Sequence, residues 1–119
     1  GAGIRTSLFI NPDEAMIEGS ASVKADAIEL HTGEYSNAVS EAERISQLDR
    51  LRTAATRGRQ LGLAIHAGHG LTYHNVLPVA AIPECEELNI GHTVVSHAVM
   101  VGMERAVREM KALLLRARA

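Results

Sequence analysis

Four short apolar segments, separated by stretches with helical patterning, constrain the fold of this sequence more than any other feature. They lie at residues 4–10, 27–31, 63–66 and 88–90, and the last could extend through 93–95. Each is short enough for a strand, and each is followed by polar or glycine-rich sequence. Strands that alternate with helices predict an α/β fold with a parallel sheet and right-handed crossovers.

Helix signals fill the intervals between these segments. Pro12 and the two acidic residues after it favour a helix start. Gly62 is placed to end a long helix, and Asn75 is a plausible N-cap for a brief helix that stops before Pro83. The long helix is predicted to face the core through Ala38, Ala42, Ile45, Leu48, Leu51 and Ala55. A terminal helix beyond Ser96 is predicted to do so through Met103, Ala106, Val107, Met110 and Leu114.

Length, charge and cysteine usage narrow the class of protein. The 119 residues suffice for one unit, residues 1–119, with a single core. A net charge of −2 with interspersed acids and bases argues against a nucleic-acid partner. No apolar stretch approaches the ~18 residues of a membrane span. Cys85 has no partner for an internal disulfide, and Gly1 to Gly3 do not begin a signal peptide, so we expect a cytoplasmic protein.

The number of expected strands is too small for a complete barrel. A closed (β/α)₈ barrel takes roughly 200–250 residues, whereas an open four-stranded layer would leave two apolar edges exposed. The sequence leaves open whether the chain is a barrel fragment, is completed by a second copy or another chain, or forms a small open sheet.

Polar residues gather where the expected strands end. His31, His66, His69 and His92 all fall at or just beyond carboxyl ends of strands, and Glu29 lies near the end of the second. Parallel α/β proteins bind ligands at that edge of the sheet, so we expect these side chains to share one face.

The segment His66-Ala67-Gly68-His69-Gly70 is the first candidate for chemistry. Glycine lets backbone N–H groups approach a phosphate closely, and an imidazole can transfer a proton near neutral pH. The alternative is a tight turn whose histidines are structural. Glu29 is the second candidate, either as a carboxylate for proton transfer and charge stabilisation or as one half of a buried ion pair.

Gly91-His92, followed by a helix that Ser96 could cap, is a candidate anion site. The alternative is an ordinary turn and cap, and His74 and His97 are expected to be structural or solvated. A metal site remains a further possibility, with Zn²⁺ bound by the four strand-end histidines and Glu29. The sequence lacks a compact ligand motif such as His-Glu-x-x-His.

Three motifs, in this order, resemble the C-terminal half of the pyridoxine 5′-phosphate synthase family. They are residues 28–33 (IELHTG), 67–75 (AGHGLTYHN) and 87–92 (ELNIGH), and residues 7–10 and 98–100 also resemble that family. The resemblance implies strands five to eight of a (β/α)₈ TIM barrel. It also implies a transferase of vitamin B6 biosynthesis that works by acid–base catalysis in homo-oligomers, without a metal or an organic cofactor. The implied reaction condenses 3-amino-2-oxopropyl phosphate with 1-deoxy-D-xylulose 5-phosphate and yields pyridoxine 5′-phosphate, inorganic phosphate and water.

The resemblance also assigns roles to individual residues. His69 matches the proton donor and Glu29 an auxiliary carboxylate, whereas Gly70, Gly91 and His92 match positions that hold 3-amino-2-oxopropyl phosphate. The family's other acid–base residues belong to the N-terminal half, so we expect this chain to be inactive alone. Departures from the family occur at Asn11, at His66, where Asn is common, and at Ser96-His97, where relatives have Gly-Arg. The alternatives are a metal-dependent hydrolase that uses the histidine cluster and a non-catalytic half-barrel that binds phosphate.

Overall fold

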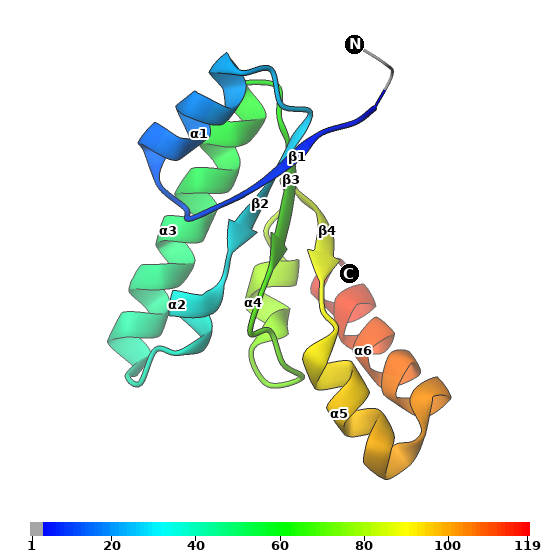
Figure 1. The fold of residues 1–119 in the computed structure, drawn as a ribbon. Coiled ribbons are helices and arrows are strands. Elements are labelled where there is room, and N and C mark those ends of the chain that lie inside the picture. The colour runs from blue at the N-terminus through cyan, green and yellow to red at the C-terminus, as the bar shows by residue number, and fades with distance from the viewer. Residues whose placement is uncertain (1–3) are drawn as a thin grey trace.

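The computed structural model describes residues 4–119 and contains one four-stranded parallel sheet with strands in the order β1-β2-β3-β4 (Figure 1). The expectation of no signal peptide rests on Gly1 to Gly3, which lie outside the described residues. The strands are β1 (Ser7–Ile10), β2 (Ala27–His31), β3 (Ala64–Gly68) and β4 (Cys85–Asn89). The helices are α1 (Glu14–Ser22), α2 (Gly33–Ser36), α3 (Glu41–Gln60), α4 (Val76–Ala80), α5 (His92–Val101) and α6 (Met103–Ala117). The prediction of an α/β chain with four parallel strands is confirmed.

The two faces of the sheet have different surroundings because successive strand residues point to opposite sides. Ile28 and Leu30 of β2 and Ile65 and Ala67 of β3 are buried against helices in one apolar core. Helix α3 approaches this face closely, since a Cβ at Gly58 would lie 2.6 Å from Ile65 Cδ1. The other members of the core come mainly from the helices and include Ile17, Leu51, Val76, Val79 and Met110.

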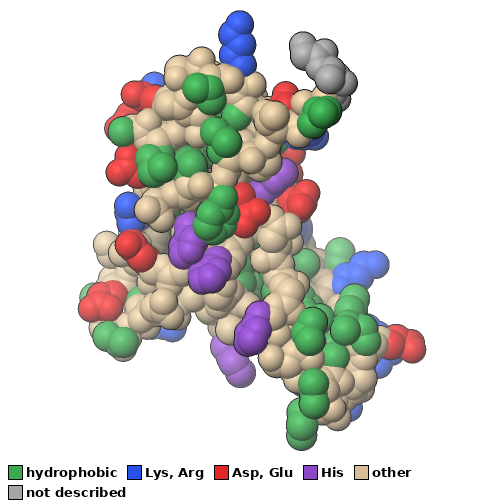
Figure 2. Space-filling view, viewed as in Figure 1, with side chains coloured by type: hydrophobic (Ala, Val, Ile, Leu, Met, Phe, Trp, Pro, Cys, Tyr) green, Lys and Arg blue, Asp and Glu red, His purple; other side chains and the backbone are tan. Residues whose placement is uncertain are grey.

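The opposite face of the sheet carries polar side chains and one aromatic ring. Phe9, Glu29, His66 and Glu87 are register partners across the four strands and therefore point to the same side. Phe9 is 55% exposed, which leaves this face accessible to solvent at β1. Figure 2 shows several histidine side chains close together near the middle of the face seen there, with acidic side chains beside some of them.

Several helix ends follow the sequence signals. The Asp13 carboxylate caps α1 by accepting from the N–H groups of Ala15 and Met16, and α3 ends two residues before Gly62, which has φ = +83°. Asn75 does precede α4, but its side chain makes no cap bond to that helix within the described residues. It accepts instead from the Thr72 N–H at 2.7 Å and holds the preceding loop.

Other expectations were wrong in position. The fourth strand begins at Cys85 rather than Leu88, and residues 93–95 are helical because α5 starts at His92. Ser96 therefore lies inside α5 and does not cap it. Helix α2 was not expected at all, and it takes residues that directly follow β2.

The predicted core faces of two helices are only partly buried. In α3 the stripe is buried at Leu51 and Ala55, whereas Ile45 is 51% exposed; Ala38 precedes the helix. In α6 Ala106 and Met110 are buried, whereas Met103 and Val107 are 52% and 48% exposed. These exposed apolar residues keep the expected helical spacing, but no element within residues 4–119 covers them. None of the helices described is long and apolar enough to cross a membrane.

Candidate active site

A cleft of about 540 Å³ opens at the carboxyl ends of the strands. All five residues to which the sequence assigned a role line it: Glu29, His69, Gly70, Gly91 and His92. They come from β2, from the loop after β3 and from the junction of β4 with α5. A larger hollow of about 690 Å³ lies along α1 and α3 and contains none of these residues.

Glu29 reaches across the sheet because Gly68 has no side chain. His31, Gly68 and Asn89 are register partners, one pleat beyond Glu29 on the same face. The Asn89 amide Nδ2 donates to Glu29 Oε1 at 2.5 Å. A Cβ at Gly68 would lie 2.9 Å from Glu29 Oε2, so glycine at this position makes room for the carboxylate.

His69 lies in a backbone conformation that L-residues rarely adopt, with φ = +90°, and Gly70 follows with φ = +80°. Two hydroxyl groups hold this turn through the His69 carbonyl. Thr32 Oγ1 donates to it at 2.6 Å, and Ser36 Oγ does so at 3.5 Å. The imidazole of His69 is exposed and stacks on that of His31, with ring centroids 4.5 Å apart. Sparsely populated backbone conformations of this kind often occur at functional sites.

The start of α5 borders the cleft. Gly91 is the N-cap, and His92 and Thr93 are the first helical residues and also line the cleft. The first N–H groups of a helix have no intrahelical acceptor, and the helix dipole favours an anion there. Because α5 begins at His92 rather than after Ser96, its first turn lines the same cleft as Glu29.

The histidines do not form a metal centre in this structure. His66 lies in the middle of β3, not beyond its end, and its Nε2 is 3.8 Å from Glu87 Oε2. Within residues 4–119, no three His, Cys, Asp or Glu side chains are grouped so that they could hold a metal ion. The zinc alternative thus gains no support from the geometry.

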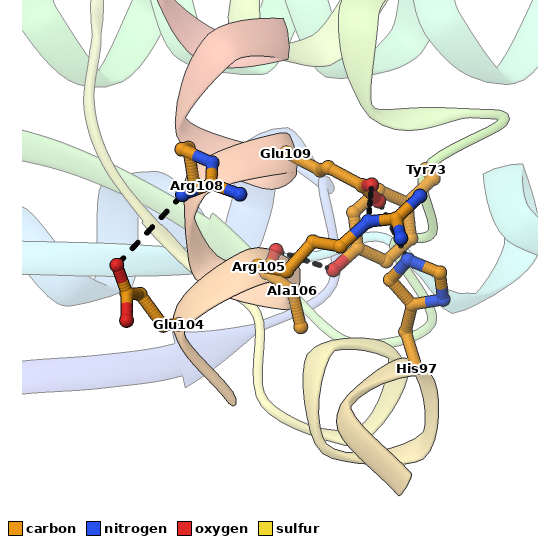
Figure 3. A network of polar contacts seen from close by, with 7 residues as sticks. All are labelled: Tyr73, His97, Glu104, Arg105, Ala106, Arg108 and Glu109. Carbon is orange, nitrogen blue, oxygen red and sulfur yellow. Dashed lines mark hydrogen bonds and ion pairs between the residues drawn. The ribbon is translucent and has the colours of Figure 1, made fainter. Parts of the chain in front are cut away.

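A polar network outside the cleft fixes α5 against α6 (Figure 3). His97 Nε2 is 2.6 Å from Glu109 Oε2, and Arg105 Nε donates to Glu109 Oε1 at 2.8 Å. These contacts from Arg105 and His97 lower the pKa of Glu109 below its ordinary value. The Tyr73 hydroxyl donates to the Ala106 carbonyl at 2.7 Å, and its ring packs on His97. His97, one residue of the Ser96-His97 pair that departs from the family's Gly-Arg, therefore has a structural contact. The other residue, Ser96, lines the cleft.

The chain matches a family described as "Pyridoxal phosphate biosynthesis protein PdxJ" over residues 1–116. The chain belongs to this family. Three relatives are named "Pyridoxine 5'-phosphate synthase". The one from Magnetococcus marinus is 52% identical over 113 residues, or 95% of this chain and 46% of the relative. Those from Syntrophotalea carbinolica and a Synechococcus species are 56% and 57% identical, each over 93% of this chain and 46% of the relative.

The chain thus spans about half the length of these PdxJ relatives. Its four successive βα units account for that share, because they form half of the eight that a TIM barrel contains.

Some residues of the cleft were not singled out from the sequence. Asn89 bonds to Glu29, and Phe9, Leu71 and Thr72 line the same space. Asn89 could have been predicted from the sequence, because it ends the fourth strand two residues before the candidate Gly91 and side chains alternate between the two faces along a strand. Phe9 required knowledge of the register between β1 and β2, which the sequence does not give.

Proposed function

We propose that this chain is part of a pyridoxine 5′-phosphate synthase, an enzyme of the transferase class, and forms the side of its active site that binds 3-amino-2-oxopropyl phosphate. The whole enzyme would condense that substrate with 1-deoxy-D-xylulose 5-phosphate to give pyridoxine 5′-phosphate, inorganic phosphate and water. Membership of the PdxJ family and the names of the relatives support the reaction. We expect the enzyme to act in the cytoplasm.

One observation carries the proposal. A carboxylate, an imidazole, a glycine turn and a helix N-terminus, drawn from three separate segments, line the same cleft. Condensation of an amine with a ketone, followed by phosphate elimination and ring closure, requires repeated proton transfer and a site for a phosphate group. The cleft offers groups suited to both tasks.

The residues divide between these tasks. His69 would donate protons, because its exposed imidazole borders the cleft and imidazole groups serve as general acids and bases in enzymes. Glu29, oriented by Asn89, would stabilise positive charge on the amine-derived intermediates. The N–H groups at Gly70 and at Gly91-His92 would hold the phosphate of 3-amino-2-oxopropyl phosphate.

Activity should require the remainder of the barrel. This proposal can be tested with a chimaera in which residues 1–119 replace the matching segment of the Magnetococcus marinus relative. We expect the chimaera to form pyridoxine 5′-phosphate from the two phosphorylated substrates and the 119-residue chain alone to form none. His69→Ala should reduce kcat by about 10²–10⁴-fold, as expected for loss of an acid–base group.

The control is the same relative, cut at the same junction and rejoined with its own segment. The proposal is wrong if this control turns over and a folded chimaera does not. A similar loss of phosphate binding and of rate in His69→Ala would make His69 a binding residue instead of the proton donor.

We also propose that the protein forms a homo-oligomer. The support is the apolar surface on α5 and α6, where Val99, Met100 and Met103 are 81%, 83% and 52% exposed. Light scattering should give a mass above that of one chain. A monomer at micromolar concentration would contradict this expectation.

A further inference from the structure

His31 has no role in the proposed chemistry, yet it contacts the residue to which the proton-donor role is assigned. It is the last residue of β2, two positions after Glu29, and therefore points to the same face of the sheet. Its ring stacks on that of His69, with centroids 4.5 Å apart and planes inclined by 29°. Phe9 of β1 packs edge-on against His31, with ring centroids 5.0 Å apart. The three rings form a continuous row from β1 to the loop after β3.

The ring of His31 is itself held in place by the backbone. The Gly33 N–H donates to His31 Nδ1 at 3.1 Å. A neutral imidazole whose Nδ1 accepts a hydrogen bond carries its own hydrogen on Nε2, so this contact selects one tautomer. Gly33 allows the contact because it lacks a Cβ, which would overlap the His31 ring and lie 3.2 Å from His69 Cδ2.

The same turn holds the backbone of His69. Thr32, which is completely buried, donates to the His69 carbonyl, and Ser36 of α2 contacts the same oxygen. Among the described residues, no hydrogen bond orients the His69 imidazole. The contact that restricts its plane is therefore the stack on His31.

We propose that His31 is a positioning residue, which sets the plane of the His69 imidazole and so directs its ring nitrogens toward the substrate cleft. The inference rests on the proposed role of His69 as proton donor. In this arrangement residues 31–36 form one support: Thr32 and Ser36 fix where the backbone of His69 lies, and His31 fixes how its ring is turned. A displacement of about 1 Å at a reacting group can cost roughly 100-fold in rate, so such a support would matter for kcat.

Two substitutions separate the stacking surface of His31 from its nitrogens. His31→Ala removes both, whereas His31→Phe keeps a flat ring and removes the acceptor for Gly33. His74→Ala is the matched control, because His74 is an exposed histidine of the neighbouring loop.

The first measurement uses NMR of the 119-residue chain and needs no activity. In the unaltered chain, NOEs should join the rings of His31 and His69, and the His69 ring protons should be shifted upfield by the stacked ring. His31→Ala should abolish the upfield shift and allow several His69 rotamers, while His31→Phe and His74→Ala should keep one rotamer. His69 signals that do not change in a folded His31→Ala chain would overturn the inference.

The second measurement uses the chimaera described above. We expect His31→Ala to lower kcat about 10- to 100-fold with little change in KM, and His31→Phe to recover most of that loss. If His31→Phe is as slow as His31→Ala while His69 keeps its orientation, the imidazole of His31 takes part in chemistry and is not a positioning residue. An inactive parent chimaera would count against the proposed function, whereas the NMR result would still decide whether His31 orients His69.

Discussion

Substitution of Gly68 by alanine tests the packing that brings Glu29 into the cleft. The new Cβ would lie 2.9 Å from Glu29 Oε2, 3.0 Å from the Asn89 carbonyl oxygen and 3.1 Å from Asn89 Cβ. The Glu29 carboxylate can move away, but only by giving up its hydrogen bond from Asn89. The Asn89 carbonyl belongs to the neighbouring strand β4 and can move only with the β3–β4 pairing.

The expected magnitude follows from two opposing terms. Overpacking of a tight site costs about 1–3 kcal/mol, whereas replacing glycine by alanine reduces the entropy of the unfolded chain and returns about 0.4–1 kcal/mol. We therefore expect Gly68→Ala to lower the free energy of unfolding by about 1–2 kcal/mol. For a chain of this size, that change corresponds to a decrease in Tm of roughly 4–8 °C.

Gly19→Ala provides a control of opposite sign. Gly19 lies in α1, and a Cβ there would meet nothing within 4 Å. Alanine is favoured over glycine inside a helix by about 0.5–1 kcal/mol, so this variant should be more stable than the original chain. Both variants can be compared by urea unfolding followed by circular dichroism. A Gly68→Ala chain as stable as Gly19→Ala would refute the argument that Gly68 is required by the close approach of Glu29 and Asn89.

Three further predictions concern parts of the molecule outside the cleft. Hydrogen bonds from Arg105 and His97 lower the pKa of Glu109. The stability that this carboxylate contributes should therefore be present above its unfolded-state pKa and be lost as the pH falls through its folded-state pKa. Between pH 6 and pH 3, Tm should fall more steeply in the original chain than in Glu109→Gln. Burial raises the pKa of the Cys85 thiol, so it should react slowly with a thiol reagent at pH 8 and rapidly once the chain is unfolded in urea. Arg118 donates to the carbonyl oxygens of residues 80, 82, 83 and 85, and Arg118→Ala should therefore lower the free energy of unfolding by about 1–3 kcal/mol in a urea titration.

Each of these predictions has a result that would contradict it. Parallel pH profiles for the original chain and Glu109→Gln would show that the contacts of Glu109 with His97 and Arg105 contribute nothing to stability. Fast labelling of Cys85 in the native state would mean that β4 opens readily. For Arg118, the lysine variant is the control: it keeps the charge but lacks the guanidinium fork, and full recovery by Arg118→Lys would show that geometry is unimportant.

The sequence predicted the order of elements well because local signals dominate in this chain. Asp13 and Gly62 mark helix ends through their own backbone and side-chain chemistry, which needs no tertiary information. The alternation of strands and helices then leaves few possible topologies. The carboxyl-end position of Glu29 and His69 follows from that topology.

The features that could not be predicted depend on the register of the strands and on whether a segment joins the neighbouring strand or the neighbouring helix. Residues 93–95 are β-branched and were considered for strand extension, yet Gly91 caps a helix at this point and the sheet ends at Asn89. The stack of His31 on His69 occurs next to the unexpected helix α2 and at a residue, His69, with positive φ, and neither feature has a clear local signature. The exposure of Ile45 and Met103 could not be anticipated, because periodicity identifies an apolar face but not whether anything covers it.

The order of strands in the sheet has a consequence for synthesis on the ribosome. Strands β2, β3 and β4 each pair with the strand that is translated just before them, so within residues 4–119 each of these three strands already has a partner when it is made. Each of these βα units can therefore dock on a sheet edge that already exists when the unit is translated. Pairing between successive strands also keeps the contacts of the sheet closer in sequence than pairing between distant strands would, which favours faster folding.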